Sequence, residues 1–356
     1  MYKYIFKSVT KLSPIILEDL NSIIDSDIPW QELYNKSILI TGANGFLPAY
    51  IVHTLLLLND KRKANIEVIG LVRNYENAKK RYGNYIFRND FLLINDDINS
   101  ELNINHNVDF IIHAASQASP KYYGIDPVGT FTANTIGTYN LLNLAVKKHI
   151  KKFLYFSSSE VYGSLYTQES ISENDFGVID PTNIRSCYAE SKRMGETMCI
   201  SFAHQFNLPV SIVRPFHTYG PGLSFDDGRV FADFASNIIR NENIIMNSDG
   251  SAIRSFCYLA DATKGFFTVL LKGENAAAYN VGNPSGETSI KDLAQLLVEL
   301  FPERNLKVEI NLQNGQSYIK STFNKLSPEI EKIKLLGWKP TTSISEGFKR
   351  TIISYL

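Results

Sequence analysis

Apolar segments and helix-forming segments alternate along the chain between Ser37 and Pro215. Five apolar segments have the length and residue types of strands, at residues 37–40, 66–72, 108–115, 153–158 and 209–215. The runs 48–60 and 135–149 between them read as helices. Buried apolar strands that alternate with helices are typical of a parallel sheet covered on both faces. The pattern therefore predicts an α/β fold built on a doubly wound parallel sheet.

The chain divides into three stretches. Residues 1–34 precede the alternating pattern, and their apolar residues predict short helices packed on the body as an N-terminal extension. Residues 35–215 carry the alternating pattern itself. After Pro215 the regularity loosens and Gly, Asn, Asp and Ser become frequent. Residues 216–356 are therefore predicted to form mostly a smaller substrate-binding lobe, with some segments returning to the first domain.

Charge and composition narrow the range of partners. Lys plus Arg equals Asp plus Glu, 36 against 36, so the net charge gives no reason to expect nucleic acid or an anionic membrane. The apolar stretch Ile51–Leu58 is far too short to span a membrane, and the first residues lack the apolar core of a secretory signal. The six histidines are scattered, and the three cysteines are too few and too far apart for a disulfide framework or a zinc site (Cys187, Cys199 and Cys257). We expect a cytoplasmic, soluble protein that holds no metal.

The first strand runs into the sequence TGANGFLP at residues 41–48, directly before a helix. Glycines at such a turn let the backbone approach a pyrophosphate, whose charge is stabilised at the helix N-terminus. An ordinary tight turn is the alternative, but the position in the series favours a Rossmann-like dinucleotide-binding domain over 35–215. Pro48 stands where a third small residue is usual; proline is tolerated in a first helical turn, so the turn should survive with looser helix–strand packing. The expected cofactor contacts are Gly42, Asn44, Gly45, Phe46 and Leu47.

Further cofactor contacts are expected after the later strands. The second strand ends at Arg73, where NAD-binding folds usually place an acid for the adenine ribose. Arg73 suits a 2′-phosphate, a stack on the adenine, or plain solvation, so NAD and NADP both stay open, with NAD as the first choice. Asp97 and Ile98 suit contacts with the adenine edge, with a turn-forming aspartate as the alternative. Ala114 and Ala115, at the end of the strand 108–115, complete this set.

Tyr188 and Lys192 lie four residues apart, so on a helix they share one face. A phenol is a poor base at neutral pH, and a neighbouring ammonium is expected to lower its pKa and make it a usable proton acceptor. A surface pair is the alternative. The sequence SSSEVYG follows the strand 153–158, which should place Ser158 and Glu160 in the same crevice at the strand ends. Their alternative role is to cap the following turn.

These motifs occur in a fixed order: TGxxGF, SSSEVYG, YxxxK and RPFHTYGPG. In this order they resemble the extended short-chain dehydrogenases/reductases that act on nucleotide sugars, from about residue 37 to the segment 336–340. The resemblance implies oxidation of a sugar at C4 with tightly bound NAD(P). It implies that Tyr188 takes the proton of a sugar hydroxyl, that Lys192 holds the nicotinamide ribose, and that Ser158 hydrogen-bonds the same hydroxyl.

The resemblance also implies a homodimer that pairs through the helices at 135–149 and 188–206. The candidate interface residues are apolar, and packing in the core is their alternative role (Leu141, Leu142, Leu144 and Met198).

Glu160 separates the reactions within this family. A 4-keto group makes the C5 proton of a sugar acidic, and a carboxylate beside C5 can remove it. Sugar 4-epimerases usually have a small or hydroxyl residue at this position. Dehydratases of the dTDP-glucose kind have an aspartate before the glutamate, where this chain has Ser159. The Ser-Glu pair resembles UDP-glucuronate decarboxylases and GDP-mannose 4,6-dehydratases.

Three further runs, at 185–193, 227–230 and 254–256, resemble the decarboxylases. Arg254 suits a diphosphate or a sugar carboxylate, because guanidinium binds both in a bidentate manner. His217 and Tyr219 stand where decarboxylases commonly have Asn and Phe, so a 4,6-dehydratase, a 4-epimerase and a C4 oxidoreductase remain alternatives. His217 is a substrate contact or a histidine of the core. The expected substrate contacts are Ser159, Arg185, His217, Arg229 and Arg254.

Two hypotheses from other functional classes remain: a protein without turnover, and a dehydrogenase that uses free cofactor. A cofactor-binding sensor or scaffold would have no physical need for Ser158, Tyr188 and Lys192 together, so their presence favours an enzyme. A dehydrogenase that uses free cofactor on a substrate without a nucleotide would release NAD(P) in every cycle. A tightly bound nicotinamide in the purified protein would argue against it.

Overall fold

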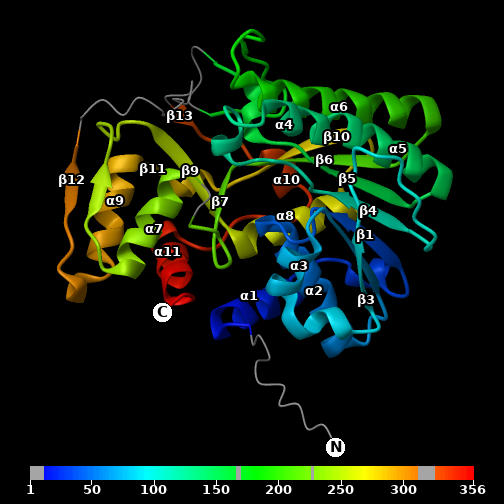
Figure 1. Ribbon diagram of the computed structural model, residues 1–356, viewed down its shortest axis with the longest axis horizontal. Coiled ribbons are helices and arrows are strands. Elements are labelled where there is room, and N and C mark those ends of the chain that lie inside the picture. The colour runs from blue at the N-terminus through cyan, green and yellow to red at the C-terminus, as the bar shows by residue number, and fades with distance from the viewer. Residues whose placement is uncertain (1–11, 166–169, 226–227, 312–324) are drawn as a thin grey trace, which may run out of the picture.

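A seven-stranded parallel sheet forms the centre of the computed structural model, which describes residues 12–165, 170–225, 228–311 and 325–356 (Figure 1). Its strands run in the order β10-β6-β5-β4-β1-β2-β3. They are β1 (Ser37–Thr41), β2 (Glu67–Val72), β3 (Phe91–Asn95), β4 (Phe110–His113), β5 (Lys152–Phe156), β6 (Val210–Pro215) and β10 (Ala277–Val281). The predicted doubly wound parallel sheet is confirmed. The strand predicted at 108–115 is shorter, so Ala114 and Ala115 lie beyond its end.

The strand order reverses between β1 and β4. The chain proceeds from β1 outward to β3 and then returns to β4 on the other side of β1, with Thr41 opposite His113 in the register. Connections that leave two neighbouring strands in opposite directions open a crevice at the carboxyl ends of those strands. The TGANGFLP turn begins at this point.

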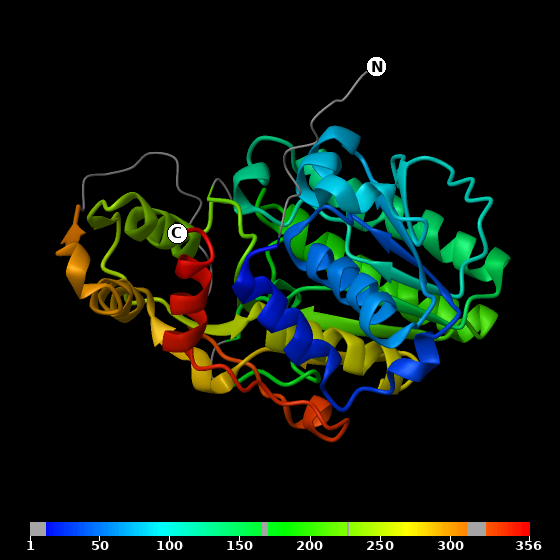
Figure 2. The same ribbon diagram turned by 90° about the horizontal axis from the view of Figure 1, so that it is seen from below.

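Helices cover both faces of the sheet (Figures 1 and 2). One face carries α4 (Pro127–Asn134), α5 (Ile136–Lys148) and α6 (Ser186–Phe206), and the other carries α1 (Pro14–Ile24), α2 (Phe46–Arg62), α3 (Tyr75–Tyr82) and α8 (Leu259–Lys272). The helix predicted at 48–60 begins two residues earlier and includes Pro48, which is buried in its first turn, so the predicted turn survives.

The four residues proposed as a dimer interface point the other way. Leu141, Leu142 and Leu144 are buried in the core between the helices and the sheet, and Met198 packs against the same cluster. The alternative role in the core therefore holds for the three leucines, because the helix face that carries them covers the central sheet, while Met198 is partly buried and its place in an interface stays a prediction.

A smaller sheet lies beside the ends of the central strands, at the left of Figure 1. It consists of β9 (Ile253–Tyr258), β7 (His217–Tyr219), β11 (Glu287–Ser289) and β13 (Lys325–Leu326). The remaining elements of this half are β8 (Ile244–Met246), β12 (Val308–Ile310), α7 (Val230–Arg240), α9 (Ile290–Glu299) and α11 (Ile344–Ile353), whereas α10 (Glu331–Lys334) packs against β10 of the central sheet. Short 3₁₀ turns are η1 (Trp30–Leu33), η2 (Gly83–Phe87), η3 (Pro120–Tyr122), η4 (Ser159–Tyr162), η5 (Pro284–Gly286) and η6 (Pro302–Arg304). The boundary drawn at residue 215 stays a prediction.

The described part of the extension, residues 12–34, packs on the body through α1 and η1. Leu20, Ile23 and Ile24 of α1 are buried in the main core cluster. The Trp30 ring meets the Phe267 ring of α8 edge-on, with ring centroids 4.9 Å apart. In Figure 2, α1 begins near α11 and runs alongside α8.

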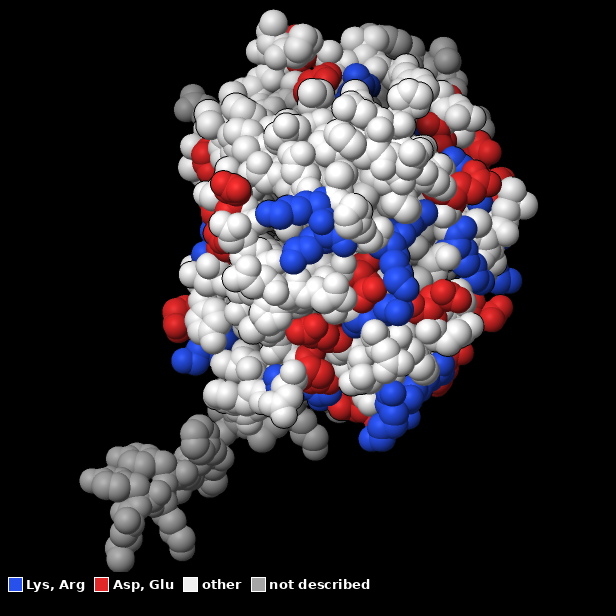
Figure 3. Space-filling view, turned by 90° about the vertical axis from the view of Figure 1, so that its right-hand side faces the viewer, with Lys and Arg blue, Asp and Glu red and all other residues white. Residues whose placement is uncertain are grey.

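The surface in Figure 3 carries basic and acidic side chains interspersed over its lower half, while the upper part has few charged residues. Within the ranges that the structure describes, no helix is both long enough and apolar enough to cross a membrane. The described residues also contain no cluster of three or more His, Cys, Asp or Glu side chains that would suit a metal ion.

Candidate active site

The glycine-rich turn between β1 and α2 leaves no room for side chains. Gly42 has φ of +63°, and a Cβ there would lie 2.7 Å from the Cα of Ala115. The Gly45 amide donates to the Gly42 carbonyl at 2.7 Å, which closes the turn, and Gly45 caps α2. Backbone N–H groups at a helix N-terminus attract anions. The turn therefore provides the close backbone approach that a pyrophosphate requires.

A chain of buried hydrogen bonds, which the sequence pattern did not predict, fixes this turn to the segment after β4. The Thr138 hydroxyl donates to the Asn134 carbonyl at 2.7 Å, so it accepts from Nε2 of His113 at 2.9 Å. Nδ1 of His113 is then the acceptor for the Thr41 hydroxyl at 2.8 Å, whose oxygen in turn accepts the Ala115 amide at 3.1 Å. Burial, and next the Lys192 charge, lower the pKa of His113 to about 3, so it is neutral. The sequence feature that could have indicated this network is His113, a single polar residue at the end of an apolar strand.

The remaining predicted cofactor residues differ in their exposure and in their contacts. Arg73 is exposed at the end of β2, and Asp97 accepts the Asn99 amide at 2.9 Å, which is its turn-forming role. The Ile98 side chain is buried against Gly137 of α5, and its expected contact with adenine stays a prediction. Asn44, Phe46 and Leu47 are partly buried in and beside the turn, and Ala114 is partly buried after β4.

The crevice fits a dinucleotide on two observations. The first is the glycine turn, where a side chain at Gly42 would clash with Ala115, so that only backbone atoms line the surface there. Ser116, which follows Ala115, has a buried hydroxyl oxygen with no hydrogen-bond partner among the described residues. Such an oxygen costs free energy unless a bound group satisfies it.

Ser158, Tyr188 and Lys192 meet at the end of β5. Ser158 caps η4, and its hydroxyl accepts the Glu160 amide at 3.2 Å and hydrogen-bonds the Tyr188 hydroxyl. Lys192 is buried one helical turn after Tyr188, and its Nζ donates to the Phe156 carbonyl at 2.6 Å. The predicted juxtaposition of the three side chains is therefore present.

The predicted direction of the Tyr188 pKa is wrong. Burial raises this pKa to about 12, while the hydrogen bond from Ser158 lowers it and the charge of Glu160 raises it further. Burial also lowers the pKa of Lys192 to about 7. Desolvation disfavours both charged forms, and the ammonium is directed at the Phe156 carbonyl rather than at the phenol. Four-residue spacing could not reveal either effect.

Ser157 has a different task from Ser158. Its hydroxyl donates to Glu196 of α6 at 2.5 Å, and the Arg214 guanidinium binds the same carboxylate in a bidentate manner at 2.8 and 2.6 Å. Buried, hydrogen-bonded pairs of this kind fix local geometry. The network anchors β5 and β6 to α6 just before the SSSEVYG turn, which leaves Ser158 to face Tyr188. Ser159 is buried at the start of η4.

Glu160 lies among three arginines from distant segments. Arg185, directly before α6, donates to its carboxylate at 3.2 Å, and Arg229 and Arg254 contribute favourable charge. Arg229 directly precedes α7, and Arg254 is buried in β9. Burial raises the pKa of Glu160, while the three arginines lower it, and the net direction is upward. Asp227, from the run 227–230, lies outside the described residues.

His217 and Tyr123 complete the cluster. His217, at the start of β7, faces the same three arginines, and burial followed by their charges holds its pKa well below the usual range. Its buried Nδ1 has no partner among the described residues. Tyr123 was missed: its ring stacks on that of Tyr188 with centroids 5.2 Å apart, and the Arg185 guanidinium lies 5.6 Å from it. The sequence feature that could have indicated Tyr123 is the pair of tyrosines at 122 and 123, after the strand predicted at 108–115.

A Rossmann-like sheet with a glycine cradle and a buried Ser-Tyr-Lys set defines an enzyme of the short-chain dehydrogenase/reductase class. The profile described as "NAD dependent epimerase/dehydratase family" matches residues 38–282, and the chain belongs to this family. The resemblance inferred from the motifs is confirmed.

Relatives and solved structures agree with this membership. The chain is 35% identical over 315 residues to UDP-glucuronic acid decarboxylase 6 of Arabidopsis thaliana, covering 88% of this chain and 87% of the relative. It is 35% identical to UDP-glucuronic acid decarboxylase 1 of Xenopus tropicalis, over 89% of this chain and 71% of the relative. The structure of Pal from Bacillus thuringiensis superposes with a TM-score of 0.73 at 28% identity, covering 89% and 98% of the two chains. UDP-glucose 4-epimerase from Thermotoga maritima shares the fold, with a TM-score of 0.75 at 24% identity over 90% and 98%.

Proposed function

We propose that this protein is an NAD-dependent decarboxylase of UDP-glucuronate. The observation that carries the proposal is Glu160, held among Arg185, Arg229 and Arg254 beside the Ser158–Tyr188 pair. Guanidinium groups bind diphosphates and carboxylates in a bidentate manner, so a site where three of them meet suits a substrate that carries both a diphosphate and a sugar carboxylate. The decarboxylase names of the relatives support the same substrate.

NAD would lie along the glycine cradle, with the pyrophosphate at Gly42 and Gly45 and the nicotinamide ribose at Lys192. When bound, NAD supplies the hydride acceptor for oxidation of the sugar at C4. Arg73 is exposed, so solvation accounts for it without a 2′-phosphate. Mass spectrometry of the nucleotide released from purified protein separates NAD from NADP.

The residues of the chain supply the proton chemistry. Tyr188 is a phenol in the structure without cofactor, and the positive charge that NAD would bring to the crevice would favour its phenolate, the form that can accept the proton of the C4 hydroxyl. Ser158 orients both hydroxyls. A C4 ketone next to a C5 carboxylate is a β-keto acid, which loses carbon dioxide readily. Arg254 and Arg185 hold the anionic groups of the substrate. When the bond between C5 and the carboxylate breaks, Glu160, whose pKa burial raises, donates the proton that takes the place of carbon dioxide at C5. Stacking on Tyr123 keeps the Tyr188 ring in place.

The test is product analysis with UDP-glucuronate and NAD. The expected result is release of carbon dioxide and a nucleotide sugar that is lighter by one carbon dioxide if the hydride returns to C4, or by one carbon dioxide and two hydrogens if a 4-keto sugar and NADH are released. A product that has lost one water instead indicates a dehydratase, and a product of unchanged mass indicates an epimerase; either result refutes the decarboxylase. Retention of NAD with no turnover on UDP-, dTDP-, GDP- or CDP-sugars supports a scaffold.

We further propose that two copies pair through α5 and α6. These helices expose four large apolar side chains (Ile136, Tyr139, Met194 and Ile200). Clustered exposed apolar residues often mark an interface between proteins. Tyr139→Glu with Ile200→Glu is expected to convert a dimer into a monomer in sedimentation experiments. A monomeric parent would refute the pairing.

A further inference from the structure

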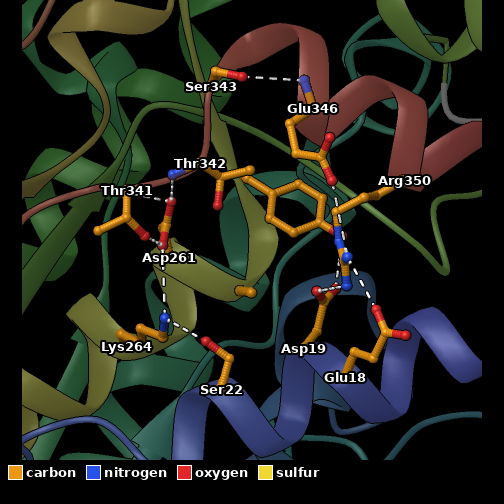
Figure 4. Close-up of a pocket in the computed structure, with 12 residues that line it drawn as sticks. Glu18, Asp19, Ser22, Asp261, Lys264, Thr341, Thr342, Ser343, Glu346 and Arg350 are labelled. Carbon is orange, nitrogen blue, oxygen red and sulfur yellow. Dashed lines mark hydrogen bonds and ion pairs between the residues drawn. The ribbon is translucent and has the colours of Figure 1, made fainter.

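A pocket of about 470 Å³ lies where α1, the start of α8 and α11 meet, away from the proposed active site (Figure 4). Its walls come largely from outside the family match at 38–282, because α1 precedes that match and α11 follows it. Figure 4 shows Asp19 and Arg350 directed toward each other across the junction, while Lys264 is directed toward Asp261 and Ser22.

Asp19 joins four elements with one carboxylate. Its Oδ2 accepts the hydroxyl of Tyr258 at 2.7 Å and that of Tyr50 at 3.1 Å, and its Oδ1 accepts Nη2 of Arg350 at 2.8 Å. Tyr258 ends β9, Tyr50 lies in α2, and Arg350 lies in α11. Arg350 also donates to the Ile15 carbonyl in the first turn of α1 at 3.3 Å.

The elements that meet at Asp19 also reach the two halves of the active site. Helix α2 begins at the glycine turn, where we place the pyrophosphate. Strand β9 carries Arg254, four residues before Tyr258 and therefore on the same side of the strand. A shift of β9 relative to α2 would move Arg254 away from the cofactor crevice.

Docking of α1 does not require this carboxylate. Leu20, Ile23 and Ile24 bury the apolar face of α1 against α2 and α8, which is sufficient to hold a short helix. Burial raises the pKa of Asp19 even though Tyr258 and Arg350 lower it, so placing a charge here is costly. The Asp19 carboxylate therefore adds little to the free energy of docking α1, but its three hydrogen bonds fix the orientation of the elements that donate them.

We propose that Asp19 is a positioning residue that fixes β9, and with it Arg254, relative to the dinucleotide half of the site. The N-terminal extension thereby acts on substrate binding without touching the substrate. Asp19 works through Tyr258 and Arg350, and the two tyrosine hydroxyls are the links to β9 and α2.

The kinetic test compares Asp19→Asn with Glu18→Gln, and it rests on the proposed function. Glu18 is the matched control, because it binds the same Arg350 at 3.1 Å but is largely exposed and reaches neither tyrosine. Asp19→Asn should raise KM for UDP-glucuronate about tenfold, because the loss of one charge-assisted hydrogen bond has an effect of that size. Its kcat should stay within about twofold of the parent. Glu18→Gln should change neither. An unchanged KM in Asp19→Asn, or an equal rise in both variants, overturns the proposal.

A second readout does not depend on the substrate. Amide hydrogen exchange in the peptide that contains β9 should become faster in Asp19→Asn and stay at the parental rate in Glu18→Gln. If the parent does not turn over UDP-glucuronate, the proposed function fails, and exchange alone decides the role of Asp19. If Asp19→Asn does not fold, Tyr258→Phe removes one donor and keeps the ring, and the same rise in KM and in β9 exchange is required.

Discussion

The Glu160 carboxylate accepts a hydrogen bond from the Arg185 guanidinium at 3.2 Å, in a pocket that also contains the charges of Arg229 and Arg254. The glutamate follows β5, and the arginine ends the loop that leads into α6. The pair lies beside the stacked rings of Tyr123 and Tyr188. Three basic side chains and one carboxyl group therefore meet beside Tyr188.

Glu160→Gln should abolish proton exchange at C5 and keep the shape of the site. Because general acid–base catalysis contributes about 10²–10⁴-fold, kcat on UDP-glucuronate should fall by that range while NAD affinity stays unchanged. Glu190→Gln is the control, since Glu190 forms a partly exposed pair with Arg193 on α6 and should stay within about twofold of the parent. A Glu160→Gln enzyme with parental kcat would show that Glu160 is only a turn residue.

Tyr188→Phe should remove the proton acceptor and leave the stacking on Tyr123 in place. We expect turnover to fall at least about 10²-fold, with NAD still retained after gel filtration. Tyr34→Phe, at the end of η1 and outside the crevice, should behave like the parent. If Tyr188→Phe turns over normally, the assigned chemistry is incorrect, and if it loses NAD as well, the ring serves binding.

Gly42→Ala should damage the dinucleotide cradle through a clash as well as through strain. The new Cβ would lie 2.7 Å from the Cα of Ala115, at a backbone φ that side chains disfavour. Gly337→Ala is matched, because Gly337 has φ of +92° but its Cβ would meet only the tip of Lys272 at 3.7 Å. Both variants should lose about 1–2 kcal/mol of unfolding free energy, and Gly42→Ala should in addition lose at least about tenfold in NAD affinity by titration calorimetry.

His53→Phe should flatten the acid dependence of stability. Burial lowers the pKa of His53 to about 4, so between pH 6.5 and 4 the unfolded chain binds a proton that the folded protein does not. Stability is then present above pH 6.5 and is lost as pH falls, by about 1.4 kcal/mol per pH unit for this histidine.

Urea unfolding at several pH values measures this slope. Phenylalanine should fit, because the His53 ring packs between those of Tyr82 and Tyr85 and its Nδ1 has no partner within the described chain. The exposed His204, replaced by Gln, is the control and should leave the slope unchanged. Equal slopes for His53→Phe and the parent would contradict burial of a neutral imidazole.

Local sequence determined the alternation of strands and helices, the glycine turn at Gly42 and the helical spacing of Tyr188 and Lys192. These features depend on backbone geometry and on neighbours within a few residues, which the order of residues expresses directly. The family resemblance followed from the order of such motifs.

Only the tertiary structure decided the neighbours, the burial and the pKa values of these side chains. It brought Arg185, Arg229 and Arg254 to one carboxylate, and it turned Leu141 and Leu142 into the core. It also raised the Tyr188 pKa, because desolvation depends on everything packed around a group and not on the residue four positions away. The contacts of Asp19 likewise join residues separated by most of the chain, and only folding makes them neighbours.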